Sequence, residues 1–430
     1  MIVKPSYCGS FQCIASRCRD NCCIGWEIDI DEETDQFYRT VKGEFGKRLE
    51  DGISREGTPH FRLRGEKERC AFLNNDNLCD IFIHLGEEHL CGICREHPRF
   101  YEWYEEIPGL PDWTETGLGL CCEEAARLFV SESGPLRLTA EWESGDEREQ
   151  WEKAAKHPQT EEAAYLLSIL SAREAAFRIL EGSRALKGKE SGKHRDFIED
   201  SLGDRIARLL KLAGQIQECL DDTEELEEAA GKIRRISEQS PDRSSVQNPE
   251  KSEKSVKNKE SGKSEQFAGD TEKTELQEES AAYFRQLFAV LRQLEPMGDF
   301  WPKLLDELDC SVDELLPLAA VRRGDVTELY ERLMEYGVYR YFGKCAFDGD
   351  VYSRAVLAVL LAVLARLMDL NALLRQGGLS REEQADHIRL LSKEIEYSEE
   401  NLEFLQNAFW EEEIFSKEGL SEAVKALWGA

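Results

Sequence analysis

The sequence lacks the long apolar segments that mark membrane and secreted proteins. Its longest apolar stretch, Ala355 to Ala365, has about half of the ~20 residues that a helix needs to cross a bilayer, and Arg366 ends it. The amino terminus, MIVKPSYCGSFQC, has no apolar run of about 7 to 15 residues like that of a secretory signal. We therefore expect a cytoplasmic protein with no membrane partner, in which residues 355–365 form a buried core helix.

Basic residues are far fewer than acidic ones. The 430 residues include 55 Lys and Arg against 86 Asp and Glu, which gives a formal net charge of −31. A surface of this sign repels a phosphate backbone, so we expect no nucleic-acid partner. The hydrophobic share of 41% is nevertheless large enough to build the cores of two or three domains.

Cysteine, in contrast, is abundant and unevenly distributed. Eleven of the 14 cysteines lie between Cys8 and Cys122. The other three, Cys219, Cys310 and Cys345, are scattered, and we expect them to be small buried side chains. Without a secretory signal, such a concentration of thiols favours metal or redox chemistry over a disulfide scaffold.

These eleven cysteines fall into three groups along the chain. The first contains a CxxxC step, which would place Cys18 and Cys22 one helical turn apart and facing one ion. The second contains a CxxC and a turn signal, residues 74–77, that predicts a hairpin bringing two thiols together. The third opens a predicted helix, CCEEAARLF, whose amino terminus would favour a thiolate. The groups are Cys8, Cys13, Cys18, Cys22 and Cys23; Cys70, Cys79, Cys91 and Cys94; and Cys121 and Cys122.

Thiolates are soft ligands, and they select iron–sulfur clusters or zinc. We expect an iron–sulfur cluster, with zinc as the alternative, because the supply of thiols far exceeds four. Histidines near the cysteines are few, so the pattern does not require a mixed site. The alternative to metal binding is that these cysteines are reduced, buried and purely structural.

The rest of the chain has helical patterns. Thr160 and Gly182 mark the two ends of one predicted helix, and Ser380 with Glu383 forms a capping-box pattern at the start of another. Asp31 is a predicted cap of a short helix in the cysteine-rich part. The fold class is therefore mainly α: an irregular, cysteine-rich, metal-binding N-terminal region with short strands, followed by a helical bundle.

The sequence patterns predict four parts of the chain. Residues 1–135 form the cysteine-cluster domain and residues 136–236 a helical region. Residues 237–274, rich in serine and charge, are a disordered linker or insertion. Residues 275–430 form a second helical region that packs against residues 136–236.

Four ordered motifs resemble a known family. FQCIASRCRDNCCIGWEIDID, CAFLNNDNLCDIFIHLG, LCGICREHPRF and LGLCCEEAARL are similar to the bacterial flagellin lysine-N-methylase family, and the cysteine core is similar to that of the CxxxCC zinc- or iron-chelating proteins. The likeness covers residues 8–130 and is loose beyond them, mainly at VYRYFGKCAFDGD. The family pattern marks eight metal candidates: Cys13, Cys18, Cys22, Cys23, Cys70, Cys79, Cys94 and Cys121. Cys8 and Cys91 fit the pattern less clearly, and Cys122 stands where the family usually has proline.

The resemblance implies an activity: methyl transfer from S-adenosylmethionine to lysine side chains of flagellin or of another protein that carries substrate lysines. The sequence shows no glycine-rich S-adenosylmethionine fingerprint, and CxxxCC is not the CxxxCxxC of radical enzymes. We therefore assign neither a catalytic residue nor a cofactor-binding residue from the sequence. The alternative function is a non-catalytic iron–sulfur or zinc protein with a redox, sensing or scaffold role.

Overall fold

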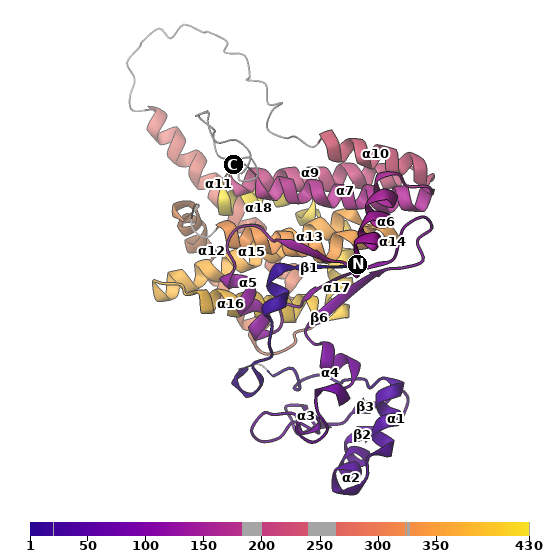
Figure 1. Ribbon diagram of the computed structural model, residues 1–430. Helices are drawn as coiled ribbons and strands as arrows, with labels where there is room; N and C mark the ends of the chain where they lie inside the picture. Colours follow the sequence, from indigo (N-terminus) through magenta and orange to yellow (C-terminus); the bar gives the residue numbers. More distant parts are fainter. Residues whose placement is uncertain (20, 183–199, 240–263, 323, 325–326, 430) are drawn as a thin grey trace.

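The computed structural model describes residues 1–430 except 20, 183–199, 240–263, 323, 325–326 and 430. Helices dominate, and the strands are short (Figure 1). The predicted mainly α class is therefore confirmed. Figure 1 shows a small, cysteine-rich part below a larger helical part.

The smaller part, here called the cysteine module, comprises residues 21–97. Its elements are α1 (Glu32–Thr40), α2 (Gly43–Gly52), β2 (Ile53–Ser54), β3 (His60–Phe61), β4 (Leu63–Arg64), β5 (Arg69–Cys70), α3 (Asp80–Leu85), η3 (Glu87–His89) and α4 (Gly92–Glu96). It has its own core, in which Tyr38, Phe61 and Phe72 are fully buried together with Cys70 and Cys91. Buried thiols therefore make up part of a core that is small for a folded unit.

A four-stranded sheet joins the module to the rest of the protein. Its strands are β1 (Ile2–Pro5), β6 (Arg99–Tyr104), β7 (Trp113–Leu118) and β8 (Leu138–Glu141), in the order β6-β7-β1-β8. β1 runs parallel to β7, whereas the β6–β7 and β1–β8 pairs are antiparallel. Because side chains alternate between the faces of a strand, one face of this sheet packs on the helices and the other faces outward.

The larger part, here called the helical body, holds most of the helices. They are α5 (Glu123–Ser131), α6 (Gly145–Lys156), α7 (Glu161–Glu181), α9 (Leu202–Asp221), α10 (Leu226–Gln239), α11 (Ser264–Leu291), α12 (Phe300–Val321), α13 (Thr327–Tyr341), α14 (Cys345–Asp348), α15 (Val351–Gln376), α16 (Arg381–Leu391), α17 (Glu399–Glu411) and α18 (Lys417–Trp428). The predicted caps are confirmed: Thr160 accepts from Ala163, Ser380 and Glu383 form the capping box, and Asp31 caps α1.

Helix α15 contains the apolar stretch 355–365 and lies in the middle of the body (Figure 1). Among the described residues, α15 is the helix long and apolar enough to cross a membrane by length and composition. However, 94% of its apolar window is buried inside the protein, as expected for a core helix.

One hydrophobic core runs through the helical body. Side chains from residues before and after the predicted linker share it, among them Leu209 of α9, Phe288 of α11 and Leu361 of α15. Tyr7 and Phe129, from the cysteine-rich region of the sequence, belong to this core and not to that of the module. Most of the predicted linker, 237–274, lies outside the described residues, but its two ends lie in helices α10 and α11.

A buried ion pair attaches the sheet to this body. Arg173 on α7 donates two hydrogen bonds of 2.6 Å to the carboxylate of Glu115 on the inner face of β7. Both side chains are almost fully buried, and a bidentate pair of this kind fixes orientation as well as distance. The sheet is therefore held at a defined position on the helices.

Candidate metal centre

The turn at residues 74–77 brings two cysteine-bearing segments together. The side-chain oxygen of Asn74 accepts from the amides of Asp76 and Leu78, at 2.9 and 3.0 Å. Leu73 then pairs with Cys79 as an antiparallel bridge. The predicted hairpin is confirmed, and Cys70 lies close enough to Cys79 for the two thiols to interact electrostatically.

Asp31 holds the CxxC segment, in addition to its predicted role as the cap of α1. Cys91 directly precedes α4, and the carboxylate of Asp31 accepts from the amide of Gly92, the first residue of that helix, at 2.8 Å. The same carboxylate caps α1, so one side chain joins the two segments. A hydrogen bond with Cys94 lowers the pKa of Cys91 and raises that of Cys94 well above its usual value.

These thiols form a first set together with Cys23, which we call the inner thiol group. A hydrogen bond with Cys22, together with burial, raises the pKa of Cys23, and the charges of Cys70 and Cys79 act in the same direction. Cys94 interacts electrostatically with Cys23 and Cys79. The inner thiol group is therefore Cys23, Cys70, Cys79, Cys91 and Cys94.

A second set lies towards the helical body, and we call it the outer thiol group. Burial raises the pKa of Cys122 to about 11, with further contributions from Cys22 and Cys13. Burial also raises the pKa of Cys121, which interacts with Cys122 and Cys22. Cys122 directly precedes the first residue of α5, which confirms the predicted helix at this point. The outer thiol group is Cys13, Cys22, Cys121 and Cys122. Cys22 also interacts with Cys23 and Cys79, so it links the two groups.

The structure thus places seven of the eight predicted ligands in these two groups and adds Cys91 and Cys122. Cys18 is the eighth; it ends the 3-10 turn η2 (Ala15–Arg17) in an extended conformation. The prediction that Cys18 and Cys22 lie one helical turn apart is therefore wrong, because no helix connects them in the described residues. Cys8 lies apart from both groups, at the sheet.

The three scattered cysteines differ in their burial. Cys219 and Cys345 are buried, as predicted. Cys310 is exposed on α12, so the prediction of a buried side chain is wrong there. Cys310 occupies a helix position that faces solvent, a distinction that its residue type does not reveal.

Two aromatic residues and a histidine fill the junction between the module and the helical body. The ring of Tyr397 lies 5.6 Å from that of Trp26 and 5.9 Å from that of His97. The Tyr397 hydroxyl is hydrogen-bonded to Nδ1 of His97 at 2.7 Å, and the indole N–H of Trp26 donates to the carbonyl of Cys22 at 2.6 Å. Tyr397 directly follows the π-helical turn η6 (Ser392–Glu396), a type of turn that is frequent at functional sites.

A buried arginine lies beside the outer thiol group. Arg340 donates to Glu396 at 2.9 Å and to the Tyr336 hydroxyl at 2.6 Å. A Cβ placed on Gly119 would lie 3.5 Å from the sulfur of Cys121 and 4.0 Å from a guanidinium nitrogen of Arg340, which puts the two groups close together. In the sequence, the signal for Arg340 is a cation within the aromatic run VYRYF, which is too weak to mark it as a functional residue.

The burial of His97 should make the stability of the folded protein depend on pH. Burial lowers the pKa of His97 to about 4, below the usual value of about 6.5. Since the unfolded chain takes up this proton first, the folded state loses stability as pH falls from about 6.5 towards 4, by on the order of 3 kcal/mol. We expect His97→Asn to remove this part of the pH dependence in urea unfolding. Parallel curves for both proteins over this range would contradict the assignment.

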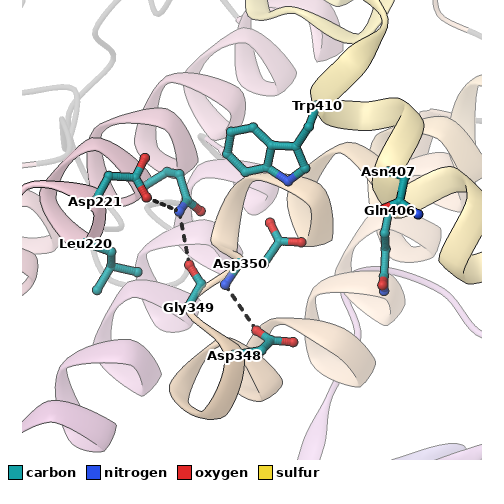
Figure 2. Close-up of a pocket in the computed structure, with 9 residues that line it drawn as sticks. Leu220, Asp221, Asp348, Gly349, Asp350, Gln406, Asn407 and Trp410 are labelled. Carbon is teal, nitrogen blue, oxygen red and sulfur yellow. Dashed lines mark hydrogen bonds between the residues drawn. The ribbon is translucent and has the colours of Figure 1, made fainter.

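A cavity of about 390 Å³ between α9, α14 and α17 contains three carboxylates under Trp410 (Figure 2). Each carboxylate already has a partner. Asp221 accepts from Gln217 at 2.9 Å, Asp348 pairs with Arg354, and Asp350 caps α15 through the amide of Ser353 at 3.1 Å. This cavity therefore shows the hydrogen bonding of a structural junction between helices.

The fold and these thiol groups define a helical protein built against a small, thiol-rich module. Residues 199–422 match the FliB lysine N-methylase C-terminal domain, so the chain belongs to this family. The match lies in the helical body, where the sequence motifs showed only a loose resemblance. It confirms the family that the N-terminal motifs indicated.

Two curated relatives carry related names. The chain is 26% identical to "Lysine-N-methylase" of Salmonella typhimurium over 146 residues, which are 32% of this chain and 34% of that protein. It is 25% identical to "Flagellar biosynthetic protein FliU" of Salmonella muenchen over 143 residues, 32% of this chain and 81% of that protein. The chain thus matches about a third of the length of the lysine-N-methylase. No solved structure matches it.

Proposed function

We propose that this protein is a protein-lysine N-methyltransferase that uses S-adenosylmethionine and contains a cysteine-bound iron–sulfur centre. Its substrate is flagellin or another protein with accessible lysines, and it acts in the cytoplasm. The names of the relatives and the family match support the methyltransferase part. The many acidic residues favour the approach of a cationic lysine side chain.

The observation that carries the metal proposal is the convergence of thiols from separate segments. The inner thiol group draws on four stretches of the module, and neighbouring thiols raise the pKa values of Cys23, Cys70 and Cys94. Buried thiols that repel one another as thiolates are stabilised when a metal holds them in the deprotonated form. The residues therefore fit a metal centre, which Cys23, Cys70, Cys79, Cys91 and Cys94 would hold.

The number of thiols favours a cluster over a single zinc ion. A zinc site needs four ligands, whereas the inner and outer thiol groups together contain nine cysteines. Iron–sulfur clusters are held by the same soft thiolate ligands.

When bound, the cluster would supply electron transfer or a Lewis-acidic iron. The chain's own residues would orient and shield it. Asp31 fixes the CxxC segment, and Trp26, His97 and Tyr397 cover the junction with the helical body. His97 remains neutral at pH 7, because burial lowers its pKa to about 4.

A methyl-transfer assay tests this function. We expect anaerobically purified protein to transfer label from methyl-labelled S-adenosylmethionine to flagellin, with mass spectrometry locating the methyl groups on lysines. The matched control is a flagellin whose surface lysines are acetylated, which should take up no label. A metal-loaded protein that methylates no lysine in flagellin or in a lysine-rich peptide library would contradict the proposal and favour a redox, sensing or scaffold role.

A further inference from the structure

Two carboxylates and an imidazole meet on the surface of the cysteine module. Segment 27–30 runs antiparallel to β3, and Asp29 lies opposite His60 in this pairing. Backbone hydrogen bonds of 2.7 and 3.0 Å lie on either side of the two residues, which therefore form the closely spaced, non-hydrogen-bonded kind of antiparallel pair. The backbone thus holds the side chains of Asp29 and His60 next to each other.

The apolar pattern of this segment directs a second carboxylate to the same face. Ile28 and Ile30 are each 2% exposed and belong to the core of the module. Since side chains alternate along an extended segment, Glu27 and Asp29 both point away from that core, and both are exposed. One ligand atom from each of Glu27, Asp29 and His60 lies within 4.8 Å of the other two. Three side chains that can bind a metal ion therefore converge.

The ring of His60 is oriented as in a metal ligand. Its Nδ1 is hydrogen-bonded to the carbonyl of Thr58 at 2.9 Å, and because a carbonyl only accepts, Nδ1 carries the proton. Nε2 of the neutral ring then has the free lone pair, and it lies 3.3 Å from a carboxylate oxygen of Glu27. Metal-binding histidines usually donate from the other ring nitrogen to a carbonyl or carboxylate in this way. Bonds of about 2.0–2.2 Å to one ion place neighbouring ligand atoms roughly 3–3.5 Å apart, which matches this separation.

The two carboxylates have no strong cation beside them. Asp35 of the same module, in contrast, pairs with Arg39 and Arg55, each at 2.8 Å. In the part of the chain that the structure describes, neither Glu27 nor Asp29 forms an ion pair with a lysine or an arginine. Neighbouring carboxylates repel each other, and a divalent cation bound between them removes this repulsion.

We propose that Glu27, Asp29 and His60 form a metal site that is separate from the thiol groups and binds one divalent first-row metal ion. Carboxylates and imidazole are harder ligands than thiolates, so this site favours ions such as Mn²⁺ or Fe²⁺. The bound ion joins segment 27–30 to β3 on the side facing away from the core, and water fills its other coordination positions. The proposal does not depend on methyl transfer.

Manganese binding tests the site on the anaerobically purified full-length protein, with thiol-bound metal left in place. Mn²⁺ binds thiolates poorly, and the electron paramagnetic resonance signal of free Mn²⁺ is lost on binding. We expect one Mn²⁺ per chain, with a Kd at least about tenfold weaker for Asp29→Asn and for His60→Ala, because loss of even an indirect metal contact has an effect of this size. Electron spin echo modulation from a coordinated imidazole nitrogen should be present in the unaltered chain and absent from His60→Ala.

The matched control is Glu50→Gln, which removes an exposed carboxylate from α2 of the same module and should leave the Kd unchanged. Asp29→Asn keeps the size of an exposed side chain, so we expect it to fold normally, as circular dichroism melting would show. If the unaltered chain binds no Mn²⁺ at millimolar concentration, Glu27 and His60 form an ion pair only and the proposal is wrong. It is also wrong if Asp29→Asn and His60→Ala bind as tightly as the unaltered chain, or if Glu50→Gln weakens binding equally, which would indicate diffuse binding to an acidic surface.

Discussion

Replacing Cys94 by serine is expected to release metal from the inner thiol group and to unfold the cysteine module. Cys94 is hydrogen-bonded to Cys91 and interacts with Cys23 and Cys79, so it lies within the group. The module's apolar core is small, and metal binding to sites of this kind contributes about 10–16 kcal/mol, which is also folding free energy. Metal analysis per chain and limited proteolysis of residues 21–97 measure the two effects.

The matched control for this variant is Cys310→Ser. Cys310 is an exposed thiol on α12 in the helical body and belongs to neither thiol group. Its replacement should leave metal content and proteolysis unchanged. Full metal content in Cys94→Ser, or equal loss of metal in Cys310→Ser, would show that the inner thiol group does not hold the metal.

Replacing Glu396 by glutamine is expected to destabilise the helical body by about 3–5 kcal/mol. Glu396 is 6% exposed and accepts from Arg340 at 2.9 Å and from the Tyr341 hydroxyl at 2.8 Å. Since the guanidinium of Arg340 is also largely buried, the variant leaves a cation in the interior without its carboxylate. Urea unfolding followed by circular dichroism measures the change.

A surface pair provides the comparison for this prediction. Arg148 and Glu152 on α6 lie 2.7 Å apart, and both are more than half exposed. Glu152→Gln should therefore change stability by less than about 1 kcal/mol. A loss for Glu396→Gln as small as that for Glu152→Gln would mean that Arg340 does not depend on Glu396 for its burial.

Local features of the fold could be predicted from the sequence because short-range chemistry determines them. The caps at Asp31, Thr160 and Ser380 depend on a side-chain oxygen and amides within one turn. The turn at residues 74–77 depends on Asn74 in the same way. These interactions join neighbours in the sequence, so their residues carry the whole signal.

Long-range pairings could not be predicted in this way. β1 pairs in parallel with β7, a strand distant in the sequence, and four residues of β1 carry too little pattern to indicate a partner. The network of Arg340, Glu396 and Tyr341 joins two helices that are also far apart in the sequence. For the same reason the group of Glu27, Asp29 and His60, which depends on the pairing of segment 27–30 with β3, was not expected.

Part of the candidate site could be predicted from the sequence, and part depends on long-range contacts. The cysteine motifs marked segments whose thiols approach one another, but not which thiols interact: Cys22 acts on Cys23 and Cys79 of the inner thiol group as well as on Cys121 and Cys122. These interactions depend on contacts between segments that are distant in the sequence, so spacing alone could not assign them. Cys91 and Cys122, which the family pattern did not mark clearly, join the groups because backbone folding brings them there.

The most direct test is elemental and sulfide analysis of the full chain, purified without oxygen and verified as folded by circular dichroism. The account predicts bound iron with a matching amount of acid-labile sulfide, and the visible absorption of an iron–sulfur cluster. Zinc without sulfide would keep a thiol-bound centre but contradict the choice of metal. A folded chain that contains neither iron nor zinc would contradict the metal centre itself.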